Sequence, residues 1–218
     1  MTSIKISPNG RYFLDSAGAP FFWLGDTQWQ LTRDVPLPDV HEILRVRKKQ
    51  GFSAFQVMLT GVGEGLLPNV EGQKPWLNDD PATPNDAFFR HADKVIAAAG
   101  EVGMILVLGI YHQEQAKRIT PDNARAYARW IAHRYKAAPN IIWTMYPKAK
   151  PEFVPVCREL AAGLREVDAS GGASGGHASG GHLITLHPDP SPTSSSFIHD
   201  EPWLDFNMNQ PCLQYEKL

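Results

Sequence analysis

The sequence predicts an α/β fold with a parallel sheet, and three observations favour it. Short and nearly continuous apolar runs recur at residues 21–26, 54–59, 104–112, 141–146, 183–187 and 204–210. Strands that are buried on both faces need such runs, because helices cover a parallel sheet on its outer side. Amphipathic segments separate most of the runs, as βαβ units require. Aromatic, amide and acidic residues gather where the runs end, which is typical of the active-site face of a (β/α)8 barrel.

A short hairpin is predicted before the first run. Residues 4–6 and 12–14 flank Asn9-Gly10, the dipeptide that most readily supplies a tight turn. We expect this β-ribbon to close the floor of the barrel.

Four helices are predicted between the strands. Gly51 and Gly103 follow the first two as stop signals, and Thr120-Pro121 opens the third with a cap and a first-turn proline. The fourth carries its apolar residues at helical spacing and ends before Asp168. The expected helices cover about residues 39–50, 84–102, 120–135 and 153–167.

One domain is expected over residues 1–218, with a single insert. Residues 169–181 contain Ala-Ser-Gly-Gly three times, a composition that cannot bury a core and predicts a flexible loop at the barrel floor. His177 and His182 in and beside this tract lack the fixed geometry of a metal site, so no metal is expected.

The chain supplies only about six βα units, whereas a closed barrel has eight. We therefore expect an incomplete barrel, truncated at its C-terminus, whose sheet has two open edges. Two alternatives stay open. The chain is a fragment, or its edges are covered by a partner, by the hairpin or by self-association with a second copy.

The charge and composition of the chain argue against nucleic acid and membrane as partners. A formal charge of -2 and a pI near 6.4 give no footprint for nucleic acid, and no run reaches the roughly 18 apolar residues of a membrane span. The first six residues lack the order of a signal peptide, so the expected location is cytoplasmic unless a leader has been removed. Two cysteines exclude a disulfide framework and a cysteine-rich metal site.

Several longer motifs resemble one known family. They are Asn9–Phe13, Pro20–Thr27, Lys49–Phe52, Asn123–Tyr127, Arg134–Lys136, Pro139–Trp143 and, most specific, Ser194–Asn207. Together these look like the apiosidase-like glycoside hydrolases, and the resemblance covers nearly the whole chain apart from the insert. It implies a (β/α)8 barrel that cleaves O-glycosyl bonds without a cofactor.

The chain departs from that family at both expected catalytic positions. Family members place Gly-Gly-Asp just after the tryptophan of the fourth strand, and that aspartate is the expected acid/base. Here Lys148 stands at the corresponding position after Trp143. The expected nucleophile, a glutamate at the end of the seventh strand, falls beyond Leu218. Glycoside hydrolysis ordinarily needs two carboxyl groups that flank the bond.

Asp26, Asp200 and Glu201 are therefore the candidate catalytic residues. Asp26 ends the first run and could accept hydrogen bonds from two adjacent hydroxyls, or else cap the segment that follows it. Asp200 and Glu201 are adjacent carboxylates, so repulsion could raise one pKa and create an acid or base. The alternative for Glu201 is a cap or an ion pair with an arginine such as Arg125 or Arg129.

Residues at the other strand ends form the candidate substrate-binding set. Aromatic faces and amide or imidazole groups suit sugar rings and hydroxyls, although each tryptophan could equally belong to the core and each histidine could be structural. Gln56 could contact ligand or join a buried network, and Asn207 and Gln210 could instead pack if the pleat points the other way. The set comprises Trp29, Gln56, Tyr111, His112, Trp143, His187, Asn207 and Gln210.

The predicted function is a glycoside hydrolase-like protein that hydrolyses or binds a carbohydrate at the strand carboxyl ends. Gly25-Asp26-Thr27 argues against a metal-dependent amidohydrolase, which would need a His-x-His pair there. The alternatives kept are a catalytically inactive carbohydrate-binding relative and a non-functional barrel fragment.

Overall fold

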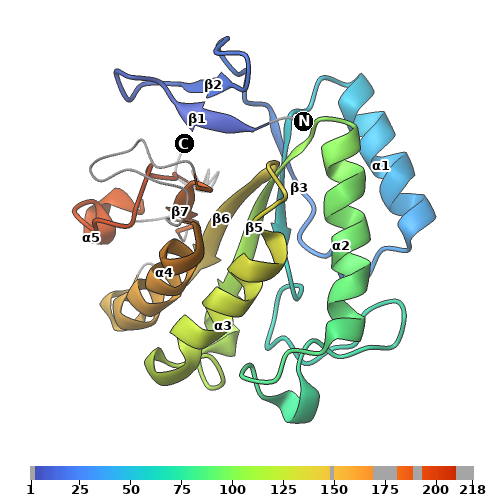
Figure 1. Cartoon of the computed structure of the whole chain (residues 1–218), viewed down its shortest axis with the longest axis vertical. Coiled ribbons are helices and arrows are strands. Elements are labelled where there is room, and N and C mark those ends of the chain that lie inside the picture. The colour runs from blue at the N-terminus through green and yellow to red at the C-terminus, as the bar shows by residue number, and fades with distance from the viewer. Residues whose placement is uncertain (1–2, 148–149, 169–180, 189–192, 210–218) are drawn as a thin grey trace, which may run out of the picture.

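The chain folds around an open parallel sheet with helices along one face (Figure 1). A computed structural model describes residues 3–147, 150–168, 181–188 and 193–209. Five strands pair in the order β3-β4-β5-β6-β7, every pair parallel, so neighbours in sequence are neighbours in space. The α/β class and the sequential order are confirmed. The strands are β3 Gly25–Thr27, β4 Ala54–Met58, β5 Ile105–His112, β6 Ile141–Tyr146 and β7 Ile184–Leu186.

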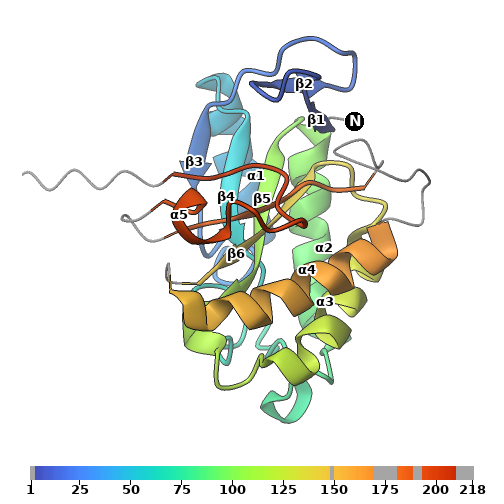
Figure 2. The same cartoon turned by 90° about the vertical axis from the view of Figure 1, so that its left-hand side faces the viewer.

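Helices follow β3 to β6 and pack on the outer face of the sheet (Figure 2). Asn85 caps α2 by accepting a hydrogen bond from the Ala87 N–H at 3.1 Å, and Thr120 with Asn123 forms a capping box at α3. The long helices are α1 Leu37–Lys49, α2 Asp86–Glu101, α3 Pro121–Tyr135 and α4 Val154–Asp168. Shorter turns are η1 Leu77–Asp79, η2 Gln113–Gln115, η3 Pro151–Phe153 and α5 Ser195–Ile198.

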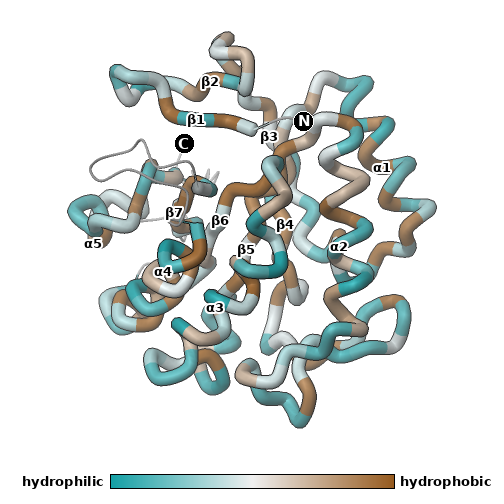
Figure 3. Tube along the Cα trace, in the orientation of Figure 1, coloured by the Kyte–Doolittle hydropathy of each residue, from teal (hydrophilic) through white to brown (hydrophobic). Residues whose placement is uncertain are grey.

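Alternation along the strands separates two layers of core. Phe55, Leu106 and Trp143 point outward into the large cluster beneath the helices. Ala54 and Ile105 point to the inner face, where partly buried aromatic residues pack on them. Figure 3 shows the hydrophobic colours running along β5 and β6, as strands covered on both faces require.

The N-terminal hairpin covers the starts of the strands, as predicted. Its strands are β1 Ile4–Ile6 and β2 Phe13–Asp15, joined through Gly10 at φ +70°. Ile4 packs on the inner cluster, and the Phe13 ring lies 5.0 Å from that of Phe206. Figure 1 shows the hairpin beyond the amino-terminal ends of β5 and β6, at the end of the sheet opposite to the strand carboxyl ends.

The prediction of a sixth strand at residues 204–210 is wrong for its described part, residues 204–209. That segment runs beside β7 but bonds to it irregularly. The Asp205 N–H donates to the Ile184 carbonyl at 2.9 Å, whereas the Asp205 carboxylate itself accepts the Ile184 N–H at 2.6 Å. A side chain thus replaces a backbone carbonyl in the ladder, and the strand does not propagate.

Two other expectations, the flexible insert and self-association through the open sheet edges, are not settled by the described residues. Residues 169–180 of the predicted insert lie outside them. At the β3 edge, the Asp26 side chain accepts the Thr27 N–H at 2.8 Å, which blocks a donor that a further strand could use. Self-association through the open edges stays a prediction.

No helix in the described ranges is long and apolar enough to cross a bilayer.

Candidate functional site

A pocket of about 510 Å³ lies on the inner face of the sheet. Thr27 of β3 and Gln56 of β4 are paired in register and both line it, while their neighbours Asp26 and Phe55 form the next registered pair. His187 enters from the end of β7. The lining residues are Phe13, Trp23, Thr27, Trp29, Gln56, His187, Phe206, Asn207, Met208 and Asn209.

Four rings from four different strand ends meet beside this pocket. The Trp29 ring stacks on Tyr146 with centroids 5.4 Å apart and planes 5° from parallel. The His187 ring meets both edge-on, 4.3 Å from Tyr146 and 5.3 Å from Trp29. The His112 ring lies 5.3 Å from Tyr146 at 63°. The strand ends thus build a continuous aromatic group with flat faces and polar edges.

A β-bulge helps to bring two of these rings together. The β5–β6 ladder shifts register between Gly109 and Tyr111, and beyond the shift His112 pairs with Tyr146. An extra residue at a bulge re-aims the side chains that follow it. The irregularity therefore sits directly before the site.

Amide groups complete the polar part of the pocket. Gln56 is half-buried, and its Nε2 lies 3.7 Å from the Met208 sulfur. Asn207 is exposed, and its Oδ1 accepts a hydrogen bond from the Ser194 hydroxyl at 3.1 Å. The His187 Nδ1 donates to the Pro188 carbonyl at 2.9 Å, because a carbonyl only accepts, and this fixes the ring orientation.

Two predicted ligands lie on the other side of the sheet. Tyr111 is fully buried in the helix-facing core, where burial raises the pKa of its hydroxyl. Trp143 belongs to the same core, and its indole Nε1 donates to the buried Asp168 carboxylate at 3.1 Å. The structure does not bring either residue to the pocket, because alternate residues of a strand face opposite sides.

Asp26, a candidate catalytic residue, also points toward the helices. Its Oδ2 lies 2.6 Å from Arg47 Nε on α1 and accepts a hydrogen bond from Gln28 Nε2 at 3.0 Å. Its Oδ1 accepts the Thr27 N–H. These contacts fit a carboxylate that secures β3 against α1, and the catalytic role stays a prediction.

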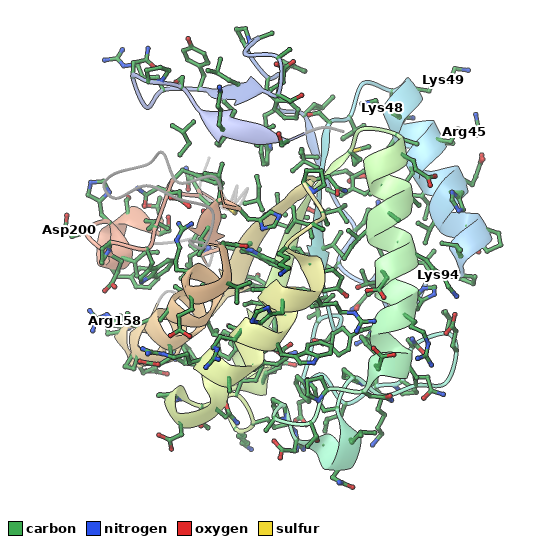
Figure 4. All side chains as sticks on the ribbon, in the orientation of Figure 1. Arg45, Lys48, Lys49, Lys94, Arg158 and Asp200 are labelled. Carbon is green, nitrogen blue, oxygen red and sulfur yellow. The ribbon has the colours of Figure 1, made fainter. Side chains whose placement is uncertain are left out.

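Glu201 and Asp200 line a different pocket, of about 780 Å³, between α4 and the segment 195–203. Arg158 binds Glu201 through three hydrogen bonds of 2.6–3.0 Å, and Trp203 Nε1 donates to it at 2.9 Å. The Arg158 contact lowers the pKa of Glu201 against the opposing effect of burial, so the carboxylate is ionised near neutral pH. Figure 4 shows Asp200 and Arg158 at the outer edge of this region.

Two residues from the sequence analysis cannot be placed, and two residues at the site were not predicted. Gln210 and Lys148 lie outside the described residues. Tyr146 and Thr27 were missed. Tyr146 ends an apolar run, which is the same signal that identified His112 and His187, and Thr27 directly follows the run at 21–26. The structure brings together Trp29, Gln56, His112, His187 and Asn207 from the predicted binding set.

Comparison with known proteins identifies the family of this chain and solved structures with a similar fold. The family model described as the apiosidase-like catalytic domain matches residues 7–215. A glycoside hydrolase family 5 crystal structure from Bacteroides vulgatus ATCC 8482 is 29% identical, with a TM-score of 0.80 over 95% of this chain and 44% of its own. A second structure, called a glycoside hydrolase, is 26% identical, with a TM-score of 0.80 over 95% of this chain and 45% of its own.

More distant structures share the fold alone. Cel5A of Thermotoga maritima, solved with its substrate mannotriose, is 21% identical, with a TM-score of 0.51 over 68% of this chain and 44% of its own. The chain thus spans less than half the length of these solved structures. A search of curated proteins found no match.

Proposed function

Because this chain belongs to the apiosidase-like family of glycoside hydrolase catalytic domains, we propose that its inner-face pocket binds a glycosidic carbohydrate. The observation that carries the proposal is the group of Trp29, Tyr146 and His187 rings beside the amides of Gln56 and Asn207. A sugar presents an apolar face of C–H groups and a rim of hydroxyls. Flat rings suit the face, and amide groups both donate to and accept from hydroxyls.

The pocket also has suitable dimensions and position. Its volume of about 510 Å³ lies within the range of small-molecule sites, about 300–1,000 Å³. Trp29 and His187, which line it, follow the ends of β3 and β7, and active sites of (β/α)8 barrels lie at the carboxyl ends of the strands.

Hydrolysis is the second candidate activity, and family membership favours it. The reaction ordinarily uses two carboxyl groups about 5–9.5 Å apart. None of the described residues that line the pocket carries a carboxylate. Glu201, held ionised by Arg158, suits a base or nucleophile better than an acid, but it lines the other pocket. Binding therefore has more support from the described site than turnover has.

The test is a panel of glycosides and oligosaccharides that is read both by binding and by product release. Trp29→Ala should weaken binding about tenfold, equivalent to about 1.4 kcal/mol, and Gln56→Leu should weaken it similarly. Trp130→Ala is the matched control, because that half-buried indole on α3 packs on Phe89 of α2 and on Arg134, in the helix layer.

Outcomes of the panel separate the candidates. Binding by the parent chain that is lost in Trp29→Ala and kept in Trp130→Ala supports the proposal. Product release that is abolished by Glu201→Gln or Asp26→Ala would establish hydrolysis by the predicted carboxylates. A folded parent that binds no member of the panel would overturn the proposed function.

A further inference from the structure

One buried amide ties together the carboxyl ends of two strands. Gln115 ends the short turn η2 that follows β5, and its side chain is fully buried. Its Oε1 accepts the His112 N–H at 3.0 Å, and its Nε2 donates to Thr60 Oγ1 at 2.9 Å. Thr60 lies just past β4 and is 1% exposed. The amide thus bridges β4 and β5 where their backbone ladder has ended.

The loop after β4 packs down on the same amide. Gly65 has φ +74°, and a Cβ atom there would lie 2.9 Å from Gln115 Nε2 and 2.7 Å from Trp76 Cη2. Only glycine fits this backbone and this space. Trp76 is buried in turn against the Tyr127 ring, 6.0 Å away on α3. Strand ends, loop and helix layer therefore meet at Gln115.

The bridge leads directly into the aromatic group of the pocket. Gln115 holds the His112 backbone, and the His112 Nδ1 accepts the Glu114 N–H at 3.3 Å, which orients the imidazole. That ring packs edge-on against Tyr146 at 5.3 Å, and Tyr146 stacks on Trp29. A displacement of His112 would therefore also shift the Tyr146 and Trp29 rings beside the pocket.

We propose that Gln115 is a positioning residue of the carbohydrate site, an inference that rests on the proposed function. A buried side chain with both amide atoms bonded is a directional constraint, whereas an apolar side chain of equal volume would fill the space without fixing His112. Gln115 does not line the pocket, and it acts through His112 and Tyr146.

The experiment compares Gln115→Met with a matched variant at the far end of the sheet. Asn140 is equally an amide, 3% exposed, and its Nδ2 donates to the Ile96 and Met104 carbonyls at 3.1 and 3.3 Å. Asn140→Leu also removes two hydrogen bonds of a buried amide, but at the amino-terminal end of β6. Thr60→Val, which removes only one bond of the bridge, serves if Gln115→Met does not fold.

Two readouts are taken on each folded variant. The first is the NMR shift of the His112 ring protons in the ligand-free chain, which the Tyr146 ring current sets. The second is the affinity for whichever panel sugar the parent binds. We expect Gln115→Met to move the His112 shift and to weaken affinity roughly three- to tenfold. Asn140→Leu should leave both unchanged while lowering the melting temperature.

The two readouts distinguish failure of the inference from failure of the function. An unmoved His112 shift and parental affinity in Gln115→Met, or in Thr60→Val, overturn the positioning role and leave the carbohydrate site intact. If the parent binds no sugar, the proposed function fails, and a moved shift in Gln115→Met still supports control of the aromatic group by Gln115. Equal effects of Asn140→Leu and Gln115→Met on both readouts would also overturn the inference.

Discussion

The ion pair at the floor of the sheet makes stability depend on pH in a definite direction. His182 Nδ1 lies 3.2 Å from Asp168 Oδ2, and its Nε2 lies 2.8 Å from the Ala138 carbonyl. Both partners accept hydrogen bonds, so this arrangement favours the protonated imidazole, which donates from both ring nitrogens. The side chains of His182 and Asp168 are only 9% and 3% exposed. Trp143 Nε1 also donates to this carboxylate.

The pKa of His182 is raised by this arrangement. Burial alone would lower it, but the hydrogen bond and charge of Asp168 and the bond to Ala138 outweigh burial and the nearby Arg165. A folded-state pKa above the unfolded value gives stability that is complete below about pH 6.5. That contribution is lost as the pH rises through the folded-state pKa. Removing one partner of a buried ion pair costs about 3–5 kcal/mol.

We therefore expect His182→Gln to lower the free energy of unfolding by about 3 kcal/mol at acidic pH, and by less as the pH increases. Urea unfolding of parent and variant from about pH 5.5 to 9 measures the difference. His133→Gln, at an exposed position on α3, is the control and should show little difference at any pH. A difference for His182→Gln that is constant, or that grows with pH, would refute the reasoning.

Two further predictions concern stability. Asp26→Asn should lower the free energy of unfolding by about 1 kcal/mol because it weakens a half-exposed ion pair with Arg47. Adding Arg47→Gln to this variant should lower it little further, and additive losses in the double-mutant cycle would contradict the pairing. Shortening residues 169–181 to a tight turn should change the free energy of unfolding by about 1 kcal/mol or less, since such a loop contributes mainly closure entropy; a melting temperature lowered by many degrees would show that the tract packs on the fold.

The sheet could be predicted from the sequence because its physical signal is strong. Strands covered on both faces need continuous apolar runs, and helices such as Asp86–Glu101 carry caps and periodic apolar residues that fix their ends closely. The exception was the run at 204–210. There, the Asp205 carboxylate takes the place of a backbone carbonyl, a choice that depends on the long-range position of Ile184.

The pocket residues could be predicted only in part, because the sequence does not show which face of a strand each residue occupies. A fully apolar run does not reveal which residues face the helices, so Trp143 could not be told from a pocket residue. The bulge at Gly109 then shifts the phase, which places Tyr111 outward and His112 inward beside Tyr146.

The ion pair between Arg158 and Glu201 could not be predicted from the sequence either. An arginine partner for Glu201 was foreseen as an alternative, but the sequence pointed to α3, whereas Arg158 lies on α4. Ion pairs between residues this far apart along the chain depend on how helices dock, which local patterns do not encode.

The central claim is that carbohydrate binds at the aromatic and amide pocket of the inner face. An NMR titration of the isotope-labelled chain with the best sugar of the panel tests it most directly. We predict that the indole N–H of Trp29 and the side-chain amides of Gln56 and Asn207 shift together and saturate at one affinity. Shifts confined to the Arg158 guanidinium and its surroundings, with Trp29 and Gln56 unmoved, would contradict the account and place the ligand in the other pocket.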